Sequence, residues 1–167
     1  MKLFIAQTLD GYIAGENDDL SYLQPYHGLD FGYDAHLESV DAIVLGRRTF
    51  DVIYPQYGWT YPGRLPGVVM SARPLPAGTP AQVVTSNDPR AVAARYPNAY
   101  VDGGAGTIRA FLQIDAITEA RIFTLPIMIG SGVRLFSEAP GFSLKGRLES
   151  STVHGAGVVE NRYLKAY

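Results

Sequence analysis

Short apolar runs alternate with longer amphipathic segments along most of the chain. Apolar runs of strand length, bounded by turn residues, predict buried strands at residues 3–6, 42–45, 68–70, 82–85 and 99–101. Apolar positions three or four apart predict helices at residues 30–40, 47–53, 89–96 and 107–114. Asn87 or Asp88 is expected to cap the third of these helices, because Pro89 suits its first position. Strands that alternate with helices favour a mostly parallel sheet with helices on both faces.

The C-terminal third breaks this alternation. Further strand-like stretches follow one another without a helix, at residues 120–125, 127–129, 133–136, 148–153 and 158–164. The last two alternate between apolar and polar positions and predict an antiparallel hairpin at one edge of the sheet. We therefore expect one α/β domain over residues 1–167, with a mixed, mostly parallel sheet and an antiparallel C-terminal edge.

Composition narrows the range of functions. The chain has 47% hydrophobic and 18% charged residues, a globular balance, and a net charge of −2, which argues against nucleic acid as a partner. It has no cysteine, and its three histidines lack metal-ligand spacing, so thiolate chemistry and a metal site are not expected. The N-terminus turns polar at Gln7 and no apolar run reaches membrane-spanning length, so we expect a cytoplasmic protein without a membrane partner.

Three strand ends carry residues suited to an anion. The segment Gly46-Arg47-Arg48-Thr49 joins a predicted strand to a helix, and so does the glycine-rich segment from Asp102 to Thr107. Ser71 and Arg73 follow a third strand. Helix N-termini offer free backbone N–H groups, and ligands of such sheets bind beyond the carboxyl ends of the strands. Each segment alone could also be an ordinary turn with solvated arginines, but together they favour a phosphate-bearing ligand.

Common hydrolase motifs are missing from the sequence. It has neither a Gly-x-Ser-x-Gly elbow nor a Gly-Lys-Ser/Thr phosphate loop. A nicotinamide cofactor fits the remaining chemistry, because hydride transfer needs positioned rings rather than a side-chain nucleophile. A flavin in its place stays open at this point.

Four motifs in a fixed order carry a family resemblance. They are Thr8 to Ala14, Gly46 to Phe50, Val101 to Ala105, and Pro126 to Phe136. With them, nearly the whole chain resembles the dihydrofolate reductase superfamily, in the branch of the C-terminal reductase domain of the bacterial riboflavin-biosynthesis deaminase/reductase. The resemblance implies a three-layer α/β fold, NADPH as hydride donor and a homodimer. The zinc-binding signature of the deaminase half is absent, so we expect a stand-alone reductase-like module.

The resemblance also implies positions for the cofactor. Near the nicotinamide it places Gly11, Tyr12 and Ala14. Around the phosphates it places Gly46, Arg47, Arg48 and Thr49, and beside the adenosine 2′-phosphate Ser71 and Arg73. For the cofactor pyrophosphate it implies a cradle that consists of Asp102, Gly103, Gly104, Ala105, Gly106, Thr107 and Ile108. Which of the three arginines meets the 2′-phosphate is left open.

The substrate side is less well defined. The spacing of the folate enzymes places a proton-donating carboxylate near Asp30, with Asp34 one turn later; alternatively Asp30 caps a helix and Asp34 is solvated. The aromatic residues Tyr54, Tyr57, Trp59 and Tyr61 could shape a pocket for a flat ring, or cover a sheet edge or a dimer face.

The leading hypothesis is an NADPH-dependent reductase of a small planar nitrogen heterocycle, pterin- or aminopyrimidine-like, roofed by a mobile loop over residues 11–19. The alternatives are a non-catalytic nucleotide-binding protein that retains the NADPH cradle, and a structural domain that binds neither.

Overall fold

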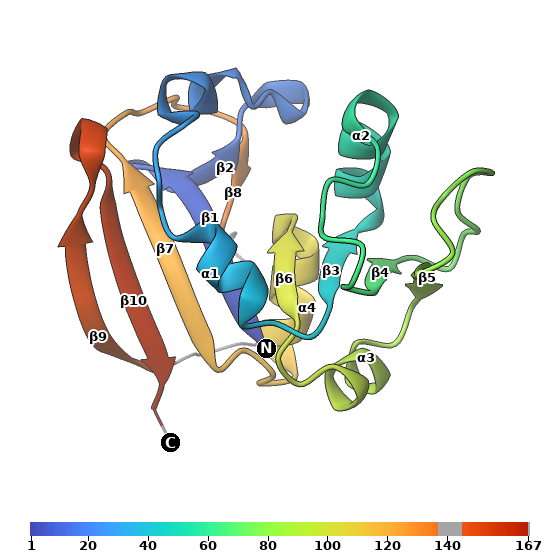
Figure 1. The fold of residues 1–167 in the computed structure, drawn as a ribbon. Coiled ribbons are helices and arrows are strands. Elements are labelled where there is room, and N and C mark those ends of the chain that lie inside the picture. Colours follow the sequence, from blue (N-terminus) through green and yellow to red (C-terminus); the bar gives the residue numbers. More distant parts are fainter. Residues whose placement is uncertain (137–144, 167) are drawn as a thin grey trace.

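The central sheet runs through the whole molecule in the computed structural model, which describes residues 1–136 and 145–166 (Figure 1). Within these residues eight strands pair in the order β5-β4-β3-β6-β1-β7-β10-β9. In that order their bounds are Val83–Ser86, Gly67–Met70, Ile43–Gly46, Tyr100–Gly103, Lys2–Thr8, Glu119–Leu125, Val159–Lys165 and Gly146–Val153. All pairs from β5 to β7 are parallel, whereas β10 pairs antiparallel with both β7 and β9. The predicted mixed sheet with an antiparallel C-terminal edge is confirmed.

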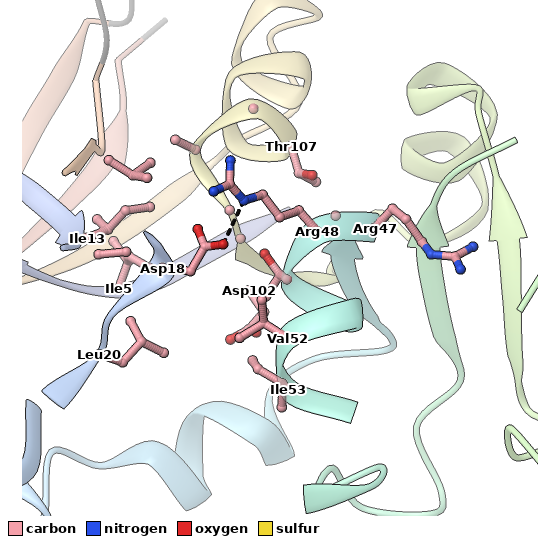
Figure 2. Close-up of a pocket in the computed structure, with 18 of the residues that line it drawn as sticks. Ile5, Ile13, Asp18, Leu20, Arg47, Arg48, Val52, Ile53, Asp102 and Thr107 are labelled. Atoms are coloured by element: carbon pink, nitrogen blue, oxygen red, sulfur yellow. Dashed lines mark hydrogen bonds and ion pairs between the residues drawn. The ribbon is translucent and has the colours of Figure 1, made fainter. Parts of the chain in front are cut away.

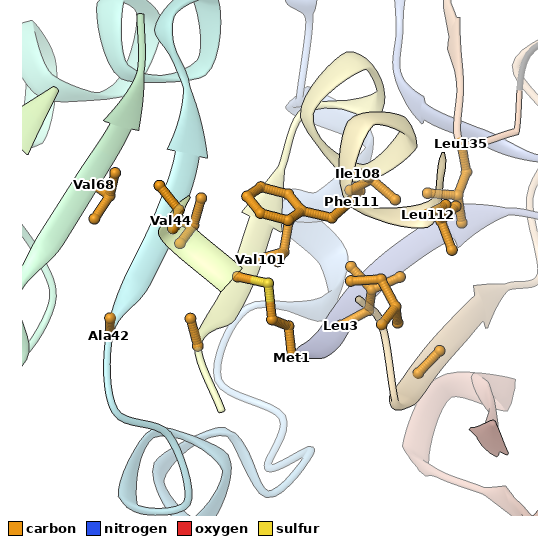
Figure 3. Close-up of a cluster of buried hydrophobic side chains, with 14 residues drawn as sticks. Met1, Leu3, Ala42, Val44, Val68, Val101, Ile108, Phe111, Leu112 and Leu135 are labelled. Atoms are coloured by element: carbon orange, nitrogen blue, oxygen red, sulfur yellow. The ribbon is translucent and has the colours of Figure 1, made fainter. Parts of the chain in front are cut away.

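Two layers of helices cover the sheet because its inner strands are apolar on both sides. Alternate residues of a strand point to opposite faces. On one face, Val44, Val68 and Val101 pack with residues of α3 (Pro89–Arg95) and α4 (Ala105–Gln113), as Figure 3 shows for α4. On the other, the neighbouring strand residues form a second cluster with Leu37 of α1 (Tyr33–Glu38) and Phe50 of α2 (Arg47–Tyr57). The result is the expected three-layer arrangement.

The predicted cap of α3 is confirmed for one of its two candidates. The carboxylate of Asp88 accepts hydrogen bonds from the backbone N–H groups of Arg90 and Ala91, at 2.9 and 3.1 Å. Pro89 occupies the first turn, where its missing N–H costs nothing.

Two helices, α1 and α2, depart furthest from their predicted bounds. α1 begins only at Tyr33, because Gly32 adopts a left-handed conformation with φ +72° before it. Asp30 does not cap this helix: its carboxylate accepts from the N–H of Gly32 at 2.7 Å in a local turn. α2 continues past Pro55 to Tyr57 and is followed by Gly58, so the predicted end of this helix at residue 53 is wrong.

Residues 11–19, expected as a loop, include a strand. β2 (Tyr12–Ala14) pairs with β8 (Val133–Arg134) in a second small sheet, and the 3₁₀ turns η1 (Glu16–Asp18) and η2 (Ser21–Tyr26) follow. The Asp10 carboxylate holds this sheet to the chain beyond β7, accepting from the N–H of Gly130 at 2.8 Å. A Cβ on Gly132 would overlap the carbonyl oxygen of Ala14, so the close pairing requires glycine there.

Residues 127–129 form no strand, contrary to expectation. Pro126 ends β7, and the N–H of Ile127 turns back to the carbonyl of Leu125 at 2.8 Å. In the described part of the chain, none of the helices is long and apolar enough to cross a membrane.

Candidate functional site

A cavity of about 550 Å³ lies where the carboxyl ends of the central parallel strands meet the first turns of two helices. Ile5 and Ala6 of β1 contribute to its lining, as do the starts of α2 and α4. Figure 2 shows Ile13 and Leu20 on one side, and Arg48, Val52 and Ile53 of α2 on the other. This is the ligand position expected for an open α/β sheet.

The two strand-to-helix turns touch each other and form a cradle. A Cβ on Gly46 would fall 2.5 Å from Oγ1 of Thr107, and a Cβ on Gly104 would fall 3.2 Å from Oγ1 of Thr49. Glycine is therefore needed at position 46 for α2 and α4 to begin side by side. The peptide bond between Gly103 and Gly104 is cis.

This cradle fits the phosphates of a dinucleotide. Within the described part of the chain, no side chain caps the N-terminus of α2 or α4, so the N–H groups of their first turns are available to a ligand. A Cβ on Gly103 or Gly106 would enter open space, so the missing side chains leave room in front of these N–H groups. Ala14 and Ala105 line the same cavity.

The arginines after β3 point to different places. Arg47 is one of the lining residues, but its side chain points away from the cavity (Figure 2); its Nε lies 2.7 Å from Asp51 and its Nη1 donates to the carbonyl of Pro74 at 2.8 Å. Arg73 lies 3.4 Å from the same Asp51 carboxylate, and its N–H donates to Oγ of Ser71 at 3.0 Å. Two guanidinium groups thus share one carboxylate, which leaves this cluster positively charged.

The side chain of Arg48 instead points toward the cavity. Its Nε is 2.7 Å from Oδ2 of Asp18, so the pair joins α2 to the turn after β2 (Figure 2). Arg48 is 73% exposed, so we expect the ion pair to exchange readily with another anion.

Several predicted site residues lie outside the cavity lining. Ile108 is fully buried in the core, and Tyr12 is buried with its hydroxyl donating to the carbonyl of Gly130 at 3.1 Å. Gly11, Ser71 and Arg73 are also absent from the lining. Their cofactor roles stay predictions.

Asp102 supplies a carboxyl group to the cavity. It lies near the end of β6, one residue before Gly103, and the hydroxyl of Tyr61 donates to its Oδ2 at 2.6 Å. Burial raises the pKa of Asp102, and hydrogen bonding from tyrosine hydroxyl groups offsets part of that rise. The sequence placed Asp102 only in the cofactor cradle, whereas this environment also suits a proton donor.

Asp30 and Asp34 are not brought to the cavity. Both are exposed, and neither is among its lining residues. The proton-donor role expected for them stays a prediction without a supporting contact.

The sequence also missed the apolar wall, which consists of Leu20, Leu23, Val52 and Ile53. Helical periodicity could not distinguish the exposed side of α2 from a side facing a cavity. None of the four aromatic residues considered for a pocket wall lines the cavity; Trp59 packs over the start of β4 at Gly67, and Tyr61 reaches Asp102.

Comparisons with known proteins agree with this architecture. The profile of the RibD C-terminal domain matches residues 90–160. The uncharacterised protein YwjB of Bacillus subtilis (strain 168) is 31% identical over 98% of this chain and 97% of its own length.

Two solved structures extend the comparison. A protein of Shewanella sp. PV-4 with a provisional riboflavin-biosynthesis name superposes with a TM-score of 0.84 at 32% identity, covering 99% of this chain and 98% of its own. A diaminohydroxyphosphoribosylaminopyrimidine deaminase/5-amino-6-(5-phosphoribosylamino)uracil reductase of Thermotoga maritima superposes with a TM-score of 0.70 at 15% identity. That match covers 99% of this chain and 56% of the Thermotoga protein, and shows a shared fold. With its dihydrofolate-reductase-like fold and its cavity at the strand ends, the chain belongs to the family of the RibD C-terminal domain.

Proposed function

We propose that this protein is an NADPH-dependent reductase that acts on an aminopyrimidine-like substrate. The observation that carries the proposal is the position of the Asp102 carboxyl group, in the same cavity as the uncapped starts of α2 and α4. Family membership supports a reductase, and the name of the Thermotoga protein supports an aminopyrimidine.

The cofactor half of the cavity would be the cradle. Backbone N–H groups at the starts of α2 and α4 would bind the pyrophosphate, with the hydroxyl groups of Thr49 and Thr107 beside them. The positively charged cluster of Arg47 and Arg73 would hold the 2′-phosphate that distinguishes NADPH from NADH. When bound, NADPH supplies a hydride.

The substrate half would be the apolar wall with Asp102. Leu20 and Leu23 on one side, and Val52 and Ile53 on the other, would enclose a flat ring and exclude water. The protonated carboxyl group of Asp102 would give its proton to the substrate nitrogen as the adjacent carbon receives the hydride, and would regain a proton from solvent. Its raised pKa keeps a larger protonated fraction near neutral pH than an ordinary aspartate has.

The test combines cofactor binding with turnover. NADPH is expected to raise the melting temperature of the protein by more degrees than NADH does at equal concentration. NADPH oxidation, followed by absorbance with 5-amino-6-(5-phosphoribosylamino)uracil and its dephosphorylated form, is expected to depend on Asp102. Asp102→Asn should lower kcat by at least about 100-fold while leaving the NADPH-induced shift in place. Asp34→Asn should keep the wild-type rate, because Asp34 is exposed outside the cavity.

Two results would contradict the proposal. A wild-type rate for Asp102→Asn would remove its proton-donor role, and a loss in Asp34→Asn would return that role to the early helix. NADPH binding without oxidation of NADPH by either compound would favour the non-catalytic nucleotide-binding alternative.

The 2′-phosphate assignment has its own test. Arg73→Ala is expected to weaken NADPH binding about tenfold or more while changing NADH binding less than about twofold, since only NADPH carries the extra phosphate. Arg90→Ala, an exposed arginine at the start of α3, is the matched control. Equal losses for both cofactors in calorimetric titrations would rule out the assignment.

A further inference from the structure

The chain segment between α2 and β4 follows a fixed path over the sheet. The ring of Trp59 covers Gly67 at the start of β4 so closely that a Cβ there would overlap it. The rings of Trp59 and Tyr61 contact each other, with centroids 4.7 Å apart. Further along, Arg64 donates to the carbonyl of Leu37 at 3.0 Å and Leu65 is buried. Contacts on both sides of Tyr61 therefore determine where its side chain goes.

Tyr61 reaches the site only through Asp102. Its hydroxyl donates to Oδ2 of Asp102 at 2.6 Å, across 41 positions of sequence. Tyr61 is not among the residues that line the cavity. An effect of Tyr61 on a bound substrate must therefore pass through the Asp102 carboxyl group.

We propose that Tyr61 is a positioning residue for Asp102: its hydrogen bond to Oδ2 holds the carboxyl group in the orientation from which it gives its proton to the substrate. This role rests on the proposed function, because it gives the Asp102 proton a destination. A hydroxyl group has one hydrogen, and Tyr61 directs it to Oδ2, so this oxygen is held toward Tyr61 while Asp102 lines the cavity.

The other groups that face Asp102 are two tyrosines. The hydroxyl of Tyr100, the first residue of β6, lies 3.0 Å from the carbonyl oxygen of Phe4 and is also a hydrogen-bonding partner of the Asp102 carboxyl group, and Tyr33 comes from the start of α1. Burial and the charge of Asp102 raise the pKa of Tyr33, Tyr61 and Tyr100, so all three stay neutral over the working pH range. Among the described residues no cation contributes to the pKa shift of Asp102, so hydrogen bonding is what stabilises its charged form.

Removing the donor has a directional consequence. A hydrogen bond to a carboxylate favours the charged form, so its loss disfavours that form. We expect Tyr61→Phe to raise the pKa of Asp102 further, by about one unit. The phenyl ring retains the contact with Trp59, so the fold is preserved.

The experiment titrates the carboxyl carbons of ¹³C-aspartate-labelled protein by NMR, with Asp102→Asn identifying the Asp102 signal. Tyr61→Phe is expected to move the Asp102 titration upward by about one unit. Tyr54→Phe is the matched control, because the Tyr54 hydroxyl donates to the carbonyl of Gly78 at 3.1 Å, away from Asp102. In turnover assays, the alkaline limb of the kcat/KM profile should move upward by the same amount in Tyr61→Phe, with the KM for NADPH unchanged.

The outcomes separate this inference from the proposed function. An unchanged Asp102 titration in Tyr61→Phe, or an equal shift in Tyr54→Phe, would overturn the positioning role even if Asp102→Asn abolishes activity. The second case combines a shifted Asp102 titration in Tyr61→Phe with full activity in Asp102→Asn. This result would support the hydrogen bond between Tyr61 and Asp102 as the control of the Asp102 pKa, but it would overturn the proton-donor function of Asp102.

Discussion

His36 is a buried histidine on α1 that packs between aromatic rings. Its ring centroid lies 4.9 Å from that of Phe4 and 4.7 Å from that of Tyr100, and its Nε2 finds no hydrogen-bond partner in the described residues. Burial lowers the pKa of His36 to about 4, and the positive charges of Arg121 and Lys2 add to the effect. The protein therefore folds around the neutral imidazole.

This burial predicts a loss of stability in mild acid. The folded-state pKa is below the unfolded value, so the unfolded chain binds more protons as the pH falls below about 6.5. We expect His36 to remove about 2 kcal/mol of unfolding free energy between about pH 7 and about pH 5, and His36→Phe to abolish this component. Urea unfolding across this range measures it, with His27→Phe at an exposed position as the control. If the unfolding free energies of the wild type and His36→Phe changed with pH in parallel, the predicted contribution of His36 would be contradicted.

Individual site residues could be predicted from the sequence where they are neighbours along the chain. The glycines and arginines after β3 and β6 could be found because each group is contiguous and follows an apolar run. The pairing of Tyr61 with Asp102 could not be predicted, because the two residues are 41 positions apart and no local pattern signals their contact. The different directions of Arg47 and Arg48 were equally hidden, since each depends on a carboxylate that the fold brings close.

At the scale of elements, α3 is the helix whose start the sequence described most fully. Asp88 accepts two hydrogen bonds from the first turn and Pro89 follows it. Such caps act within a few residues, so they can be recognised without knowledge of the fold.

The cap predicts a measurable stability loss. Asp88→Ala should lower the unfolding free energy by about 1 kcal/mol, and Asp88→Asn should retain most of it, because asparagine also caps well. Asn87→Ala is the matched control, since Asn87 is exposed and outside the helix. Guanidinium denaturation compares the unfolding free energies of the three variants. A larger loss of unfolding free energy in Asn87→Ala than in Asp88→Ala would show that Asp88 is not the capping residue.

Elements whose bounds were mispredicted owe their limits to contacts that apolar periodicity does not record. β2 exists because β8 pairs with it, more than one hundred residues later in the chain. α1 is shortened by a local turn, in which the Asp30 carboxylate bonds the N–H of Gly32 and competes with helix initiation.

For the whole molecule, β9 is the exposed end of the sheet. All eight of its residues are exposed, including Leu148 and Val153, and one edge of the strand is free within the described residues. Free strand edges with apolar side chains are places where another chain can pair.

The homodimer implied by the resemblance is therefore expected to form through β9. Sedimentation equilibrium should give twice the mass of one chain, and the double variant Leu148→Lys/Val153→Lys should shift the protein toward the monomer. Arg95→Lys, on the distant helix α3, serves as the control. A wild-type monomer at micromolar concentration would refute the dimer, and an unaffected dimer in the double variant would place the interface elsewhere.

The sequence by itself determined the alternation of strands and helices, the antiparallel C-terminal edge, the cap of α3 and the location of glycine-rich turns at strand ends. Each of these depends on periodicity or on contacts within a few residues, which a linear pattern records. Only the tertiary structure decided that Gly46 meets Thr107, that Asp102 takes its hydrogen bond from Tyr61, and that Asp30 and Asp34 lie outside the cavity. These facts depend on the distances between β3, β6 and the chain segment around Tyr61. Those distances are set by packing contacts between residues far apart in the chain.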